Sequence, residues 1–337
     1  MEKSDLRIVF MGTPEFAVET LRALVENGYN VVAVVTQPDK PVGRHQTEMQ
    51  PSEVKKYALS QGLPVLQPEK MKDPAFVEQL RSYQANLQVV VAFRMLPEVV
   101  WAMPEYGTFN VHAALLPQYR GAAPINWAVI NGETVTGVTT FFLDHDIDTG
   151  RIIQKKTFPI PDDADVEYVY DGLMKLGAEL CLETLETIIA ADGHPETVSQ
   201  EDVQLTQGGQ SPCTHEMLKA APKIFKETCE IDWTKSAKQV YDFVRGLSPV
   251  PGAWTTLVGA DGKETVLKIY KARKTGMVHG LGFMVQGAEL TVRDKRLLVA
   301  CGDEWLELLE VQLAGKKRMS ARDFLNGMKN VETYKVK

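Results

Sequence analysis

Short apolar runs alternate with longer amphipathic segments through the front of the chain. Apolar runs typical of buried strands occupy residues 6–11, 31–35, 87–92 and 137–143, and residues 151–158 are expected to add an edge strand. Segments with apolar residues at helical spacing occupy residues 16–24, 52–61, 73–83, 123–130 and 166–190. This alternation of strands and helices favours a mostly parallel sheet with helices on both faces. The helical connections between its parallel strands are expected to be right-handed. The sequence therefore predicts an α/β domain over residues 1–190.

The pattern changes after the last of these helices. Residues 191–222 are rich in Gly, Pro, Ser, Thr and Gln without a clear apolar period, which predicts a connection between domains. A helix is predicted at 235–245, and short strands bounded by glycines follow over 253–313, a pattern typical of a small barrel. We therefore expect residues 223–337 to form a second, smaller β-barrel domain.

Length and composition agree with this division. A chain of 337 residues is long for one domain, and its 44% hydrophobic content is ample for buried cores. No apolar run reaches about 18 residues, so we expect no membrane span. The N-terminus lacks the charged-then-apolar layout of a signal peptide, and four cysteines without Cys-x-x-Cys pairing are expected to be ordinary thiols. We therefore expect a cytoplasmic protein, and a monomer because no apolar interface stripe stands out.

Charge is distributed unevenly along the sequence. The formal net charge is −7, but residues 1–210 carry −13 and residues 211–337 carry +6. The negative net charge of the whole chain argues against nonspecific nucleic-acid binding, whereas a basic second domain is suited to a polyanionic partner. A solvated, lysine-rich surface is the alternative explanation on charge alone.

Two loops of the first domain are candidates for a binding role. The turn Gly12-Thr13-Pro14-Glu15 holds one glycine where the dinucleotide fingerprint needs three, so a nicotinamide or flavin cofactor is not expected. The segment Thr36–Pro51 is polar and longer than the usual connection in a compact domain. Long loops at the carboxyl ends of parallel strands tend to be functional, and a surface excursion without function is the alternative.

The stretch Gly107–Pro124 and the turn that follows it carry the candidate chemistry. Alternate side chains of a strand share a face, so we expect Asn110 and His112 to project side by side. Imidazole exchanges protons near neutral pH, and an amide donor stabilises negative charge on a carbonyl oxygen. Asp148, in a turn with Thr149-Gly150, offers a carboxylate to orient the imidazole. A plain turn-forming role for Asp148 is the alternative.

Other reaction types lack their motifs in this sequence. Neither a Gly-x-Ser-x-Gly nucleophile motif nor His-Glu-x-x-His or paired cysteine ligands occur. We therefore expect no metal. The trio of Asn110, His112 and Asp148 suits direct attack of a substrate amine on an activated acyl group.

The same residues carry a family resemblance. Asn110-Val-His112, Leu115-Leu116-Pro117, Tyr119–Pro124 and Asp148-Thr149-Gly150 stand in the order and spacing of a known signature. The chain thereby resembles enzymes that transfer a formyl group from 10-formyltetrahydrofolate. This family includes formyltransferases acting on glycinamide ribonucleotide, amino sugars and methionyl-tRNA. Three more stretches resemble the methionyl-tRNA branch: Phe10–Ala17, Thr36–Arg44 and Ala314–Ser320.

The resemblance implies a fold, a reaction and binding residues. The fold would be a Rossmann-like catalytic domain followed by an OB-like barrel that helps to hold tRNA. The reaction would formylate the α-amino group of initiator methionyl-tRNA for translation initiation, with Asn110, His112 and Asp148 as catalytic residues. Residues expected at the folate are Phe93, Arg94, Met95, Leu96, Leu115, Leu116, Pro117, Asp144, His145 and Asp146. Residues expected at the tRNA are Arg44, Lys271, Arg273, Lys274, Lys316, Lys317 and Arg318.

Three alternatives remain open at this level. The chain could formylate a sugar nucleotide, hydrolyse formyl-folate, or bind RNA as a catalytically silent protein. The intact trio counts against a silent protein, and the basic second domain counts against a sugar substrate.

Overall fold

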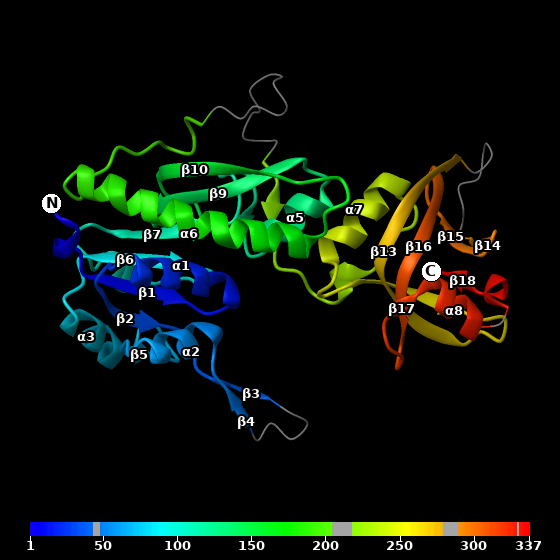
Figure 1. Cartoon of the computed structure of the whole chain (residues 1–337), viewed down its shortest axis with the longest axis horizontal. Coiled ribbons are helices and arrows are strands. Elements are labelled where there is room, and N and C mark those ends of the chain that lie inside the picture. The colour runs from blue at the N-terminus through cyan, green and yellow to red at the C-terminus, as the bar shows by residue number, and fades with distance from the viewer. Residues whose placement is uncertain (43–47, 204–217, 279–288, 329) are drawn as a thin grey trace. The chain divides into compact units, whose positions relative to one another are not determined.

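The computed structural model describes the chain except residues 43–47, 204–217, 279–288 and 329 (Figure 1). It contains two compact units. The first comprises Met1–Gly121, Val135–Pro159 and Tyr170–Ala220. The second comprises Ala122–Thr134, Ile160–Val169 and Ala221–Lys337, so two segments from the front half of the sequence pack with the back half.

The first unit is built on a mixed sheet whose order, in the described part of the chain, is β10-β9-β7-β6-β1-β2-β5. The parallel strands are β1 (Ile8–Gly12), β2 (Val31–Val35), β5 (Val65–Leu66), β6 (Leu87–Val91) and β7 (Thr108–His112). The antiparallel strands at one edge are β9 (Val135–Phe142) and β10 (Ile152–Pro159). The prediction of a mostly parallel sheet is therefore confirmed.

Helices cover both faces of this sheet (Figure 1). They are α1 (Glu15–Glu26), α2 (Glu53–Ser60), α3 (Pro74–Ser82), α4 (Glu98–Trp101) and α6 (Val166–Ala190). A Cβ added to Gly177 of α6 would lie 3.3 Å from Val111, so α6 packs on the face to which Val111 points. Val90 belongs to the core on the α3 side and pairs in register with Asn110. Asn110 and His112 therefore project on the α3 side, because in-register neighbours share a face.

The predicted loop Thr36–Pro51 contains secondary structure at both ends. Strands β3 (Lys40–Val42) and β4 (Glu48–Gln50) pair antiparallel. The interpretation of the whole segment as a loop was therefore wrong for these two short strands. Its polar composition concealed them, because a two-stranded ribbon with little burial needs no apolar alternation.

The second unit contains an antiparallel barrel. Its strands are β12 (Ala253–Val258), β13 (Glu264–Val278), β14 (Leu290–Arg293), β15 (Arg296–Ala300), β16 (Glu304–Leu313), β17 (Met319–Ser320) and β18 (Lys335–Val336). The described sheet runs β14-β15-β16-β13-β12-β18, and a bridge between Glu289 and Lys335 joins its two end strands. This closure pairs backbone groups that an open sheet would leave as free edges, as expected for the small barrel predicted from the sequence.

Helix α7 (Ala237–Leu247) explains why two front segments belong to this unit. Arg245, which is buried, pairs with the buried Asp242 and donates to the carbonyl of Ala164 at 2.9 Å. The side chain of Asn126, on α5 (Pro124–Ile130), donates to the carbonyl of Gly246 at 2.9 Å. Helix α8 (Ala321–Gly327) buries Phe324 in the hydrophobic core that α7 forms with the barrel strands. In the described part of the chain, no helix combines the length and apolar character needed to cross a bilayer.

Candidate active site

Strand β7 places His112 at its carboxyl end, where the side chain is only 6% exposed. The Nε2 atom lies 2.9 Å from the carbonyl oxygen of Tyr119. A carbonyl can only accept a hydrogen bond, so Nε2 carries a proton and donates it. The ring is thereby fixed, and Nδ1 is the nitrogen left for proton exchange.

Asp148 lies on the Nδ1 side of this ring. Its Oδ2 is 3.8 Å from Nδ1 of His112 and accepts a hydrogen bond of 2.9 Å from the backbone N–H of Gly121. The separation from Nδ1 exceeds a hydrogen bond. The Tyr119 carbonyl therefore orients the ring, whereas Asp148 places negative charge beside it.

The loop after β9 brings Asp148 back to His112. Because β9 is antiparallel to β7, its terminal Phe142 pairs with Phe109, while His112 pairs with Thr139 near the middle of β9. The chain must turn back within the following loop for its carboxylate to reach the imidazole. A Cβ added to Gly150 would lie 1.7 Å from the carbonyl oxygen of Phe142, so only glycine fits this close return.

The amide oxygen of Asn110 is left without a partner in the part of the chain that the structure describes. This atom, Oδ1, is also buried. Most buried polar atoms in proteins are hydrogen-bonded, and an amide can present either its oxygen or its nitrogen by flipping. An amide with an unpartnered oxygen beside His112 is therefore suited to a ligand with a polar oxygen or N–H group.

The comparisons with known proteins decide the family. Residues 6–185 match the model of the formyl transferase family, and residues 223–329 match that of the formyl transferase C-terminal domain. The chain belongs to the formyl transferase family. The family that the sequence motifs resemble is thus confirmed.

Relatives of this formyl transferase match it along its whole length. A protein named methionyl-tRNA formyltransferase from Parabacteroides distasonis is 59% identical over 336 residues, covering 100% of both chains. A protein of the same name from Bacteroides thetaiotaomicron is 55% identical over 336 residues, again covering 100% of both.

Solved structures share the fold at low sequence identity. An N-formyltransferase from Helicobacter canadensis, described in complex with folinic acid and dTDP-3-aminofucose, has a TM-score of 0.59 at 18% identity, covering 90% of this chain and 98% of its own. HypX from Aquifex aeolicus in complex with tetrahydrofolic acid has a TM-score of 0.58 at 20% identity, and the match covers 96% of this chain and 47% of HypX. These similarities show the fold alone.

The turn between β6 and α4 holds four residues expected at the folate. Leu96 is buried in the core with α3, and Phe93 packs against the same core. Arg94 donates to the carbonyl oxygens of Glu69 (2.9 Å) and Pro68, and burial lowers the pKa of its guanidinium. Met95, by contrast, is 70% exposed. This formyl transferase thus presents one free apolar side chain here, while the Arg94 guanidinium anchors the turn.

The second group expected at the folate follows β7. Leu116 is fully buried in a small core with Phe141 and Ile152. Pro117 is also buried, and Leu115 is half-buried. The backbone N–H of Leu116 donates to Thr139 Oγ1 at 3.1 Å and its carbonyl oxygen accepts from Lys155 Nζ at 2.6 Å, so Leu116 is held within the protein. Leu115 retains a partly accessible side chain.

The third group lies in the loop that returns Asp148. Asp144 accepts hydrogen bonds from Thr149 Oγ1 at 2.6 Å and from the backbone N–H of Asp146 at 3.2 Å. His145 is exposed, and its ring lies edge-on to Trp101 with 5.3 Å between centroids. The Asp144 carboxylate thus holds the loop in shape and leaves His145 and Asp146 facing solvent.

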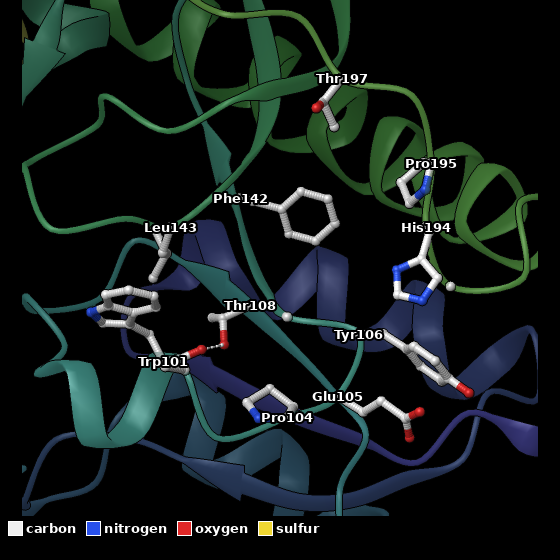
Figure 2. Close-up of a pocket in the computed structure, with 13 residues that line it drawn as sticks. Trp101, Pro104, Glu105, Tyr106, Thr108, Phe142, Leu143, His194, Pro195 and Thr197 are labelled. Atoms are coloured by element: carbon white, nitrogen blue, oxygen red, sulfur yellow. Dashed lines mark hydrogen bonds between the residues drawn. The ribbon is translucent and has the colours of Figure 1, made fainter.

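A separate pocket of about 390 Å³ lies at the opposite end of β7 (Figure 2). Its walls include Trp101, Tyr106, Thr108, Phe142 and His194. The lining also includes Leu143, at the start of the loop that returns Asp148, but not Asn110, His112 or Asp148. The pocket is therefore separate from the candidate site.

Acidic partners neutralise several of the basic residues expected at the tRNA. Arg273 pairs with Glu307 at 2.7 Å, and Lys274 pairs with Asp162 at 2.7 Å. Arg318 holds the carboxylate of Glu310 through two nitrogens and lowers the pKa of that carboxyl group.

The remaining expected cations differ in their surroundings. Lys271 lies opposite Glu310 in the sheet. Lys316 and Lys317 are exposed, and no ion pair forms at either within the described part of the chain. Arg44 lies outside the described residues. Lys316 and Lys317 thus have ammonium groups available for phosphate.

The sequence assigned no role to four residues that hold His112 and Asp148, although three of them lie in the motif Tyr119–Pro124. Tyr119 and Gly121 act through backbone atoms, and Arg120 and Gln200 act through side chains. Backbone donors and acceptors leave no mark in a sequence, and Gln200 lies in a polar stretch interpreted as a connection. Metal-ligand clusters of three or more His, Cys, Asp or Glu are absent among the described residues.

Proposed function

We propose that the protein transfers the formyl group of 10-formyltetrahydrofolate to the α-amino group of initiator methionyl-tRNA by direct amine attack. The observation that supports this most is that proteins named methionyl-tRNA formyltransferase match the chain along its full length at 55–59% identity. The candidate site agrees with it, because Asn110 Oδ1 has no partner among the described residues and lies on the same strand face as His112. We further propose that the protein acts as a cytoplasmic monomer.

The three catalytic residues divide the chemistry between them. Bound 10-formyltetrahydrofolate would supply a formyl group whose oxygen gains negative charge when the amine attacks. The Asn110 amide, whose Oδ1 has no hydrogen-bond partner among the described residues, would donate to that oxygen through Nδ2. His112 handles the proton through Nδ1, because Nε2 is committed to the carbonyl of Tyr119. Asp148 places its carboxylate 3.8 Å from Nδ1, the nitrogen through which His112 exchanges the proton.

The two substrates would bind to different parts of the chain. The folate would contact the turn Phe93–Leu96, the segment Leu115–Pro117 and the loop Asp144–Asp146. The tRNA would contact Arg44 and the basic residues of the barrel. In this proposal the formyl transfer takes place in the first unit, whereas most of the residues that bind tRNA phosphates belong to the barrel.

Acceptor choice tests the proposal. The protein is incubated with 10-formyltetrahydrofolate and, separately, methionyl-tRNA, a UDP-amino sugar, or no acceptor, and the formylated product and released tetrahydrofolate are measured. We expect formylmethionyl-tRNA only. Formylated sugar would establish a sugar-nucleotide enzyme, tetrahydrofolate release without an acceptor would establish a hydrolase, and RNA binding without turnover would indicate a silent protein.

Replacing Lys316 and Lys317 together by glutamine is expected to weaken tRNA binding. Each lysine that neutralises a phosphate contributes about 0.7–0.9 to the slope of log K against log salt, so the double variant should have a slope shallower by up to about 1.8. Filter binding of tRNA from low to moderate salt measures this slope. Lys337→Gln is the control, because Lys337 is paired with Glu264. An unchanged slope in the double variant would remove both lysines from the tRNA surface.

A further inference from the structure

Gln200 is a buried side chain with hydrogen bonds on both ends of its amide. It is 2% exposed, although the surrounding segment is polar. Oε1 accepts from Nε and Nη2 of Arg120 at 3.0 and 2.7 Å. Nε2 donates to the carbonyl oxygens of Asp148 and Gly150 at 2.9 and 2.8 Å. All four contacts lie within the first unit.

The segment around Gln200 is docked by backbone pairing. The backbone groups of Val198 and Ile152 exchange two hydrogen bonds, of 2.8 and 2.9 Å. Arg151 adds a bond from Nε to Thr197 Oγ1 at 2.7 Å. The residues that follow the turn at Asp148 are therefore attached to the same segment of chain that carries Gln200.

The hydrogen bond from Gln200 to the carbonyl oxygen of Asp148 holds a residue with an uncommon backbone conformation. Asp148 has a φ of 55°, in the left-handed region that a non-glycine residue keeps only where the surrounding structure holds it there. Gln200 binds the carbonyl of Asp148 itself and that of Gly150. These contacts hold the backbone on both sides of Thr149.

The bond to Arg120 connects this turn to the loop that holds the imidazole. Arg120 stands between Tyr119, whose carbonyl binds His112 Nε2, and Gly121, whose N–H binds Asp148 Oδ2. Gln200 therefore ties together the two loops that face the two ring nitrogens of His112.

From this geometry we propose that Gln200 is a positioning residue, which through Arg120 sets the place of the Asp148 carboxylate relative to His112. Gln200 touches neither substrate in this role. The proposal rests on the proposed formyl transfer and adds a residue to it. An amide is required because Oε1 must accept from a cation while Nε2 donates to two carbonyl oxygens, a combination that neither carboxylate nor alkyl groups provide.

Two variants of Gln200 test this role. Gln200→Met removes all four bonds, whereas Gln200→Glu keeps an acceptor for Arg120 and removes the donor to Asp148 and Gly150. We expect both to lower kcat for formylation of methionyl-tRNA by about 10- to 100-fold, because small displacements of catalytic groups have effects of this size. KM for either substrate should change by no more than about twofold, since substrate contacts are retained.

Gln154→Met is the matched control. Gln154 also lies in the first unit and uses both ends of its amide, donating to Thr187 and accepting from Thr184 at 2.9 and 3.2 Å. These bonds connect β10 to α6 and do not touch the loops that hold the trio. A kcat close to wild type is expected for Gln154→Met, even if its melting temperature falls as far as that of Gln200→Met.

A double-mutant cycle separates positioning from general stability. If Arg120 and Gln200 act as one connection, Arg120→Met combined with Gln200→Met should lower kcat little beyond either change alone. Fully multiplicative effects on kcat would overturn the proposal. So would a kcat within about twofold of wild type in Gln200→Glu.

Amide hydrogen exchange measures how firmly these contacts hold the loop, independently of catalytic activity. Peptides spanning residues 143–151 should exchange faster in Gln200→Met and Gln200→Glu than in wild type or Gln154→Met, because the loop loses its carbonyl contacts. Unchanged exchange in the Gln200 variants would overturn the proposal. A wild-type protein that does not formylate methionyl-tRNA would overturn the proposed function instead, and the exchange result would still decide the role of Gln200.

Discussion

Replacing His112 by alanine is expected to lower kcat for formylation of methionyl-tRNA by about 10²–10⁴-fold. The imidazole has one nitrogen committed to the Tyr119 carbonyl and the other beside Asp148, so alanine removes the proton-handling group. Because His112 is 6% exposed, the surface that meets the tRNA should not change. Single-turnover formylation measures the loss, and retention of tRNA on a filter measures binding.

His194→Ala is the control for His112→Ala. His194 is an exposed histidine of the same unit, where its ring meets Tyr106 with 6.2 Å between centroids. Its removal should leave formylation near the wild-type rate. Near-normal turnover by His112→Ala would contradict the proposed mechanism.

Replacing Asp148 by asparagine is expected to lower kcat by about 10²–10³-fold without unfolding the site. Asparagine tolerates the left-handed backbone at least as well as aspartate, and its Oδ1 can still accept from the N–H of Gly121. The substitution therefore removes the negative charge beside Nδ1 of His112 and little else. Steady-state kinetics with both substrates varied will show whether the loss is in kcat.

Asp192→Asn provides a control with the same backbone geometry. Asp192 has a φ of 52°, and its carboxylate pairs with the N-terminal ammonium group at 2.8 Å, which lowers the pKa of that carboxyl group. Asp192 lies in the same unit as Asp148 but has no contact with the trio. An equal loss of kcat in both variants would mean that strain or stability, and not the charge of Asp148, is responsible.

Periodicity predicted the elements whose burial is regular. The long helix was predicted at 166–190 and is observed as Val166–Ala190, and the strand Val31–Val35 was predicted with its observed bounds. In both cases one face or the whole element is buried, so apolar spacing reports the structure. The ribbon of β3 and β4 was not predicted, because the side chains described in it (Lys40, Pro41, Met49 and Gln50) are exposed and impose no apolar alternation.

Segment membership and strand direction depended on long-range contacts. Residues 122–134 and 160–169 pack with the second unit through partners such as Arg245 and Gly246, which are far away in the sequence. The direction of β9 depends likewise on pairing with β7. Neither property is encoded in local apolar spacing, so neither could be derived from the pattern of a single segment.

The sequence by itself determined the fold class, the family and the chemical types of Asn110, His112 and Asp148, because these depend on residue identity, order and spacing. Only the tertiary structure decided how they act together. In the folded protein the Tyr119 carbonyl orients the His112 ring, and Asp148 Oδ2 lies 3.8 Å from its Nδ1. Gln200 connects the two loops that carry these groups, through its hydrogen bonds to Arg120 and Asp148. Backbone hydrogen bonds and a buried amide make these contacts, and their partners become neighbours only when the chain folds.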